Sequence, residues 1–188
     1  MIDDTGNATV TTGEAGGAVP AAATYGLFAA WALHDAEELL TLPRWVRTRV
    51  PELRETAPWV PGRLWRALES VDEREFAVAV GVVGAMMAAA AAAGARSGGR
   101  SPAYQTVLNG FGLHGLVHLA QAAAVRGYTP GAVTSPLLVV PFTLWARGRL
   151  RRAGVLRPTR TGEVLARLAW AGAAAGAAAA RARRVVRR

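Results

Sequence analysis

The sequence contains no cysteine and no lysine. The lack of cysteine excludes disulfide bonds and any thiolate metal site. Only 19% of the 188 residues are charged and 52% are hydrophobic, which excludes disorder for most of the chain. All 22 basic residues are arginine, against 13 acidic residues, yet the mean hydropathy is positive at +0.19. A basic chain that is also apolar is typical of a membrane protein whose charges lie between apolar segments.

The apolar segments have lengths that fit membrane spans, since a spanning helix needs about 20 residues. Pro43 is expected to end the first segment, and prolines inside the fourth are expected to kink it. The fifth segment is marginal, because its Arg167 would cost ~2.5–3.5 kcal/mol at a bilayer centre. The segments are residues 21–42, 76–95, 103–125, 132–146 and 164–180.

This pattern predicts an all-α integral membrane bundle of about four to five transmembrane helices, formed by residues 21–180. A flexible tail is expected at residues 1–20 and a basic tail at residues 181–188. The alternative is a soluble bundle with alanine-rich buried helices. The segments at residues 76–95 and 103–125 argue against it, because both are apolar around the whole helix circumference. We expect the chain to lie in a bacterial cytoplasmic membrane.

Arginine and tryptophan are concentrated in residues 44–75, which hold seven arginines together with Trp45, Trp59 and Trp65. This combination is typical of the membrane–water interface, where short helices are expected. Attraction to anionic lipid headgroups explains the positive charge, so we expect lipid partners and no nucleic acid. Within the second segment, Gly81 and Gly84 predict close packing between helices.

All three histidines of the chain lie inside predicted spans, and a pair of glutamates lies there too. His34 is three residues before Glu37 and four before Glu38, so the three share one helix face. His114 and His118 share a face of another span. Titratable groups inside a bilayer are costly and indicate function by default. The two motifs differ in depth by about one helical turn, so their faces could meet.

Three imidazoles and one or two carboxylates form a ligand set that suits a divalent metal, zinc or iron. The predicted ligands are His34, Glu38, His114 and His118. Glu37 is predicted to be catalytic, as a general base toward a metal-bound water, or to be a further ligand. The alternative is a cluster without metal that specifies packing or carries protons by hydrogen bonding.

Other polar residues of these spans have less specific roles. Asp35 points about 100° away from His34 around the helix. Its side chain is expected to be a partner of the cluster, to face the second span or to face water, and the sequence leaves these three alternatives open. Asn109 is expected to form hydrogen bonds between helices. Tyr128, Pro130 and Gly131 are expected to form a tight turn with a structural role.

The string His34-Asp35-Ala36-Glu37-Glu38 near the end of a first span resembles the motif of the HXXEE family of small multi-span membrane proteins. The later strings HGLVH (residues 114–118) and RGYTPG (residues 126–131) resemble that family's second conserved region. The resemblance covers about residues 21–141. It implies a multi-span helical fold, and it favours His34, Glu37 and Glu38 as the functional core.

The favoured function is a membrane-embedded metal-dependent enzyme that acts on a lipophilic small molecule. Hydrolysis with zinc and oxidation with iron both remain open, because the ligand types do not separate them. The alternative is a non-enzymatic membrane protein that uses the cluster for structure or for proton handling.

Overall fold

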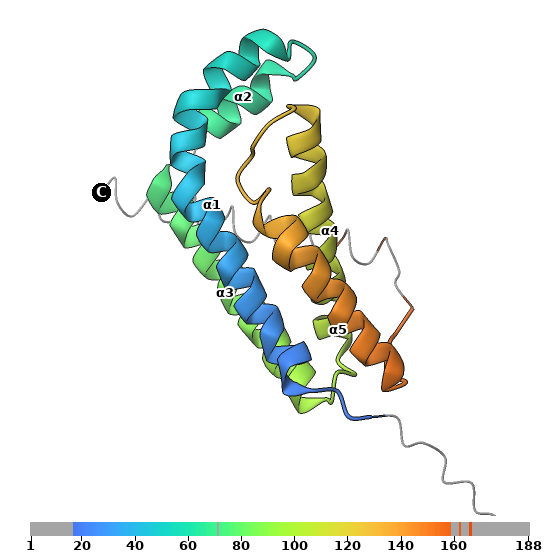
Figure 1. Cartoon of the computed structure of the whole chain (residues 1–188). Helices are drawn as coiled ribbons and strands as arrows, with labels where there is room; N and C mark the ends of the chain where they lie inside the picture. Colours follow the sequence, from blue (N-terminus) through green and yellow to red (C-terminus); the bar gives the residue numbers. More distant parts are fainter. Residues whose placement is uncertain (1–16, 71, 159–161, 163–165, 167–188) are drawn as a thin grey trace, which may run out of the picture.

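The computed structural model describes residues 17–70, 72–158, 162 and 166. In this part of the chain all regular structure is helical, which agrees with the predicted all-α class. Figure 1 shows α1 and α3 running alongside each other, with α4 and α5 beside them and α2 at one end. The elements are α1 (Ala21–Thr56), α2 (Gly62–Glu69), α3 (Glu73–Arg96), α4 (Pro102–Ala124), the π-helical η1 (Ser135–Val139) and α5 (Val140–Arg152).

Helix α1 does not end at Pro43, so that prediction is wrong. The helix continues through Pro43 and Pro51 to Thr56. A proline inside a helix costs about 3 kcal/mol, because it removes a hydrogen bond and crowds the preceding turn. Packing of the second half of α1 against α2 offsets this cost. That contact buries Val50, Leu53, Ala57 and Trp65, and each large apolar side chain contributes about 1.5–3 kcal/mol when it is buried.

The central core joins α1, α3, α4 and α5. Leu27, Tyr104 and Leu108 are fully buried in it, and the Tyr104 hydroxyl donates to the carbonyl of Ala23. A Cβ built on Gly84 would lie 2.7 Å from Cη2 of Trp31, so this glycine does permit the predicted close approach of helices. The same prediction is wrong for Gly81, since nothing lies within 4 Å of its built Cβ.

The second and third predicted segments correspond closely to α3 and α4. Asp72 begins α3 by accepting hydrogen bonds from the backbone N–H groups of Arg74 and Glu75, and Ser101 caps α4 in the same way. These caps satisfy N–H groups that have no partner within the helix.

The fourth predicted segment begins later and ends later than expected, since η1 and α5 together run from Ser135 to Arg152. The π-helical turn leads directly into α5. Pro136 lies at the start of η1, where a missing N–H costs little, whereas Pro141 lies next to the change from π-helix to α-helix. Arg147 of α5 donates to Oδ1 of Asn109 on α4, which confirms the interhelical hydrogen bond expected of Asn109. The predicted segment at residues 164–180, apart from residue 166, lies outside the described residues, and so do most of the two predicted tails.

One helix in the described part of the chain, α3, is long and apolar enough to cross a membrane. Only 22% of its most apolar stretch is buried by the rest of the protein. A single helix of this kind does not establish a membrane bundle, so the predicted four to five spans are not confirmed. Helices α1 and α4 are less apolar than a spanning helix because of their polar side chains. Helix α5 is too short, with 13 residues, and contains several arginines.

Candidate metal centre

Helices α1 and α4 bring four of the predicted site residues together. His34, Glu38, His114 and His118 each offer one ligand atom, and the four atoms lie within 4.8 Å of one another. His34 and His118 are buried, Glu38 is partly buried and His114 is exposed. The helical spacing of four residues in each pair therefore gives the convergence that the sequence predicted, and this group could hold a metal ion.

The shortest contacts in the cluster centre on His118. Its Nε2 lies 3.0 Å from Oε1 of Glu38 and 2.9 Å from Nε2 of His114. The three imidazole rings have centroids 4.4 to 5.2 Å apart and lie nearly at right angles to one another. Metal–nitrogen bonds of about 2.0–2.1 Å in a tetrahedron place ligand atoms about 3.4 Å apart. Small side-chain rotations would bring the four atoms to that spacing.

Thr134 fixes which nitrogen of His34 faces the cluster. The Thr134 hydroxyl donates to Oε2 of Glu37 at 2.6 Å, and Nδ1 of His34 lies 2.6 Å from the same hydroxyl oxygen. Because the hydroxyl has one proton, it must accept a hydrogen bond from Nδ1–H of His34. The Nε2 atom of His34 then carries a lone pair, and it is buried without a hydrogen-bond partner among the described residues. A metal ion would satisfy this orphaned acceptor.

Glu37 lies beside the ligand group and is not a member of it. Its carboxylate accepts four hydrogen bonds, from the hydroxyls of Tyr128 and Thr134 and from the backbone N–H groups of Val133 and Thr134. These bonds tie α1 to the segment that joins α4 to η1, residues 125–134, which we call the cluster loop. A catalytic role for Glu37 stays a prediction, and its hydrogen bonds indicate that it positions the loop.

The cluster loop lies directly against the histidines. Gly131 has a φ of +80°, and a Cβ built on it would lie 2.8 Å from Nδ1 of His118 and 2.9 Å from Cε1 of His34. Only glycine satisfies both the backbone conformation and the lack of space. The predicted turn at Tyr128, Pro130 and Gly131 is therefore structural, and it also packs on the candidate ligands.

Tyr128 links two parts of the site. Its carbonyl accepts a hydrogen bond of 2.8 Å from Nε1 of Trp45, and its hydroxyl donates to Glu37. Burial raises the pKa of the Tyr128 phenol, and the adjacent Glu37 carboxylate raises it further. The phenol therefore remains protonated and remains a donor at neutral pH.

Asp35 is not one of the four candidate ligands, although it lies close enough to Glu38 and His118 to interact with them electrostatically. Its side chain is buried, with 7% exposed, which makes the water-facing alternative wrong. Its Oδ2 atom has no hydrogen-bond partner among the described residues.

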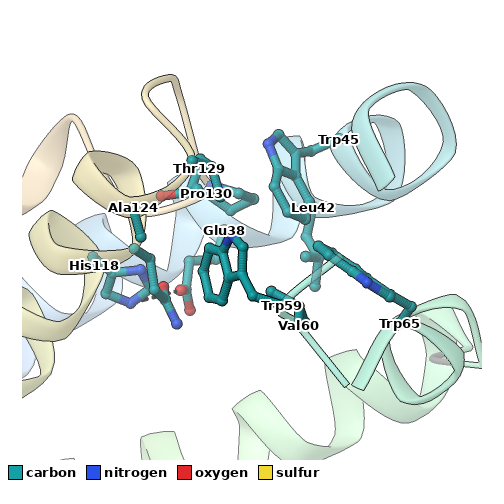
Figure 2. A pocket seen from close by; sticks show the side chains of 12 residues that line it. Glu38, Leu42, Trp45, Trp59, Val60, Trp65, His118, Ala124, Thr129 and Pro130 are labelled. Carbon is teal, nitrogen blue, oxygen red and sulfur yellow. Dashed lines mark ion pairs between the residues drawn. The ribbon is translucent and has the colours of Figure 1, made fainter. Parts of the chain in front are cut away.

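An apolar cavity of about 250 Å³ begins at the cluster (Figure 2). Figure 2 shows His118 and Glu38 on one side and Trp45 and Trp65 on the other, with the ring of Trp59 beside Glu38 between them. The sequence predicted Trp45, Trp59 and Trp65 only as interfacial residues. Their place in the cavity wall depends on the packing of α2 against α1, which no local sequence pattern indicates. The lining residues are Glu38, Leu42, Trp45, Trp59, Val60, Trp65, His118, Gln121, Ala124, Val125, Thr129 and Pro130.

The fold and the site together define an all-helical protein in which two helices and one glycine-containing loop build a three-histidine, one-carboxylate cluster. Residues 25–146 match the model of a family described as proteins of unknown function with an HXXEE motif, and the chain belongs to this family. The matched region contains the whole cluster, the cluster loop and the cavity lining. No curated protein and no solved structure was found to match the chain.

Proposed function

We propose that this protein is a membrane-embedded, metal-dependent enzyme that acts on a lipophilic substrate. His34, Glu38, His114 and His118 would hold the metal, which is zinc or iron. The observation that carries the proposal is the buried Nε2 atom of His34, which has a lone pair and no hydrogen-bond partner among the described residues and belongs to a group with three other ligand atoms. A protein that only needed packing at this position would gain stability from an apolar side chain.

The bound ion would supply Lewis acidity for hydrolysis if it is zinc, or redox chemistry if it is iron. The protein's own residues orient the reactants. Glu37 and Thr134 hold His34 in one tautomer, and the cluster loop covers one side of the histidines. Glu38 would hold the metal or, if it is not a ligand, would accept a proton near the cavity. The exposed edge of His114 leaves the cluster open to a substrate.

The exposed surface supports the membrane location. Helix α3 is strongly apolar yet mostly uncovered, whereas the core helix of a water-soluble protein is buried. Large apolar side chains are also exposed on other elements, with Leu40 of α1 at 81% and Leu137 of η1 at 74%. Such surfaces are unfavourable in water and favourable against lipid. We propose that this membrane is the bacterial cytoplasmic membrane.

A non-enzymatic role is the second candidate, and one observation favours it. Nε2 of His118 is within hydrogen-bond distance of both Glu38 and His114, so protons alone could hold these three groups together. In that case the cluster would fix the packing of α1 on α4 or pass protons between them.

Elemental analysis of the detergent-purified full chain separates the two candidates. We expect near-stoichiometric zinc or iron in the wild-type protein and loss of that metal in His34→Ala, His118→Ala and Glu38→Gln. Glu73→Gln is the matched control, because Glu73 is an exposed glutamate outside the cluster. A folded wild-type protein without metal, which does not bind added zinc or ferrous iron, would exclude the enzyme proposed here. Zinc would exclude oxidation at the metal, whereas iron would be compatible with both hydrolysis and oxidation.

A further inference from the structure

The cavity beside the cluster has two chemically different ends (Figure 2). Resting on the proposed function, we infer that this cavity binds a single-chain amphiphile. Its hydrocarbon chain lies among Trp45, Trp59 and Trp65. Its head group, which carries acceptor oxygens, lies at Thr129 and at the metal that Glu38 and His118 would hold.

The tryptophan end fits a hydrocarbon chain. Trp65 is 5% exposed and forms part of the buried cluster between α1 and α2, so it makes a fixed wall. Trp45 is held by its hydrogen bond to the carbonyl of Tyr128. Trp59 is 66% exposed and marks the open side, through which a longer chain can extend. Rigid aromatic walls with few polar groups are typical of sites that bind apolar ligand parts.

The polar end fits an acceptor oxygen. Thr129 lines the cavity, is 4% exposed, and its hydroxyl has no hydrogen-bond partner among the described residues. A buried hydroxyl without a partner is costly, and a ligand oxygen would remove that cost by accepting its proton. The amide of Gln121 adds a second donor to the lining. A metal held by the cluster would attract the same oxygen.

The volume limits the ligand to a compact one. Ligand sites commonly measure about 300–1,000 Å³. A cavity of about 250 Å³ is slightly smaller, which suits a head group and a short chain, and a longer chain would leave it on the open side at Trp59.

Equilibrium dialysis of labelled octanoate against the full chain in lipid nanodiscs tests this inference, with empty nanodiscs as the background. Octylamine is the comparison ligand, because it has the same chain and a head group that donates. We expect saturable octanoate binding at least tenfold tighter than octylamine binding. Equal binding of the two, or no saturable binding of octanoate, would overturn the inference.

Two pairs of variants locate the binding. Ala124→Phe fills the cavity and should weaken octanoate binding at least tenfold, whereas Ala123→Phe, at an exposed neighbour that is not part of the lining, should not. Thr129→Val removes the hydroxyl at nearly unchanged shape and should weaken binding about fivefold, which keeps the inference testable if Ala124→Phe does not fold. Wild-type affinity in both cavity variants would overturn it.

Metal content measured on the same samples separates the two proposals. Octanoate binding that Ala124→Phe abolishes, in a protein that holds no metal, would support the cavity and contradict the metalloenzyme. Metal at wild-type levels, with octanoate binding insensitive to both cavity variants, would support the metalloenzyme and contradict the cavity.

Discussion

The hydroxyl of Thr134 should control metal affinity, although it is not a ligand itself. Thr134→Val keeps the shape of the side chain and removes the one group that joins His34 to Glu37. The backbone N–H of Thr134 still donates to Glu37 at 2.8 Å, so the cluster loop remains attached to α1. The variant therefore changes the orientation and tautomer of His34 with little change in the fold.

The expected magnitude follows from the two hydrogen bonds of 2.6 Å that are lost. Leaving a buried donor such as Nδ1–H without a partner costs about 1–3 kcal/mol. Loss of a hydrogen bond that orients a metal-ligating histidine typically lowers metal affinity about 10–100-fold, which equals about 1.4–2.7 kcal/mol. We expect Thr134→Val to weaken zinc binding by that factor.

Competition with a chromophoric chelator, on the purified full chain, measures this affinity. Thr143→Val is the matched control, because Thr143 is buried and its hydroxyl has no hydrogen-bond partner among the described residues. Thr143→Val should bind zinc like the wild type and be as stable or slightly more stable. Equal zinc affinities in the two valine variants would refute the chain of hydrogen bonds from Glu37 through Thr134 to His34.

Three further predictions concern the loop, the metal and the membrane. Gly131→Ala should cost about 2–4 kcal/mol in stability, because it combines a positive φ with a Cβ 2.8 Å from the His118 ring. Gly127→Ala in the same loop should be tolerated. Equal melting temperatures of the two alanine variants would contradict this prediction. Removal of metal by a strong chelator should lower the melting temperature of the wild type and not that of His34→Ala, and equal shifts would argue against a bound ion. Ala85→Arg places a charge on the exposed face of α3, where it should cost about 2.5–3.5 kcal/mol in a bilayer and less than about 0.5 kcal/mol in water. The yield of the variant in the membrane fraction should therefore fall, and an unchanged yield would contradict the membrane location.

The convergence of the two histidine motifs could be predicted from the sequence, because it depends on local geometry. Residues four apart share a helix face, and the predicted lengths of the segments put both faces at similar depth. The course of α1 beyond Pro43 could not be predicted in this way. Proline commonly ends a helix, which is a preference that can be read locally. The contacts that stabilise α1 as far as Thr56 come from α2, which is distant in sequence from Pro43.

Glu37 and Glu38 illustrate the same limit at the site. Both are within one helical turn of His34, so spacing alone gives each of them access to the cluster. The cluster loop makes the distinction, because it passes on the Glu37 side and its N–H and hydroxyl groups occupy that carboxylate. Glu38 is left to face His118. Loop position depends on tertiary packing, which the sequence pattern does not contain.

The cluster loop forms part of both the cavity wall and the surroundings of the histidines. Thr129 and Pro130 form part of the cavity wall, and the residues that follow, Gly131 and Thr134, touch or hydrogen-bond the histidines. A shift of this loop therefore changes both places together. If occupancy of the cluster stiffens the loop, occupancy of the cavity becomes more favourable, and by thermodynamic reciprocity the cavity ligand tightens the hold on the ion by the same factor. A protein that holds an ion in the cluster and a ligand in the cavity would then retain the ion best when the ligand is present.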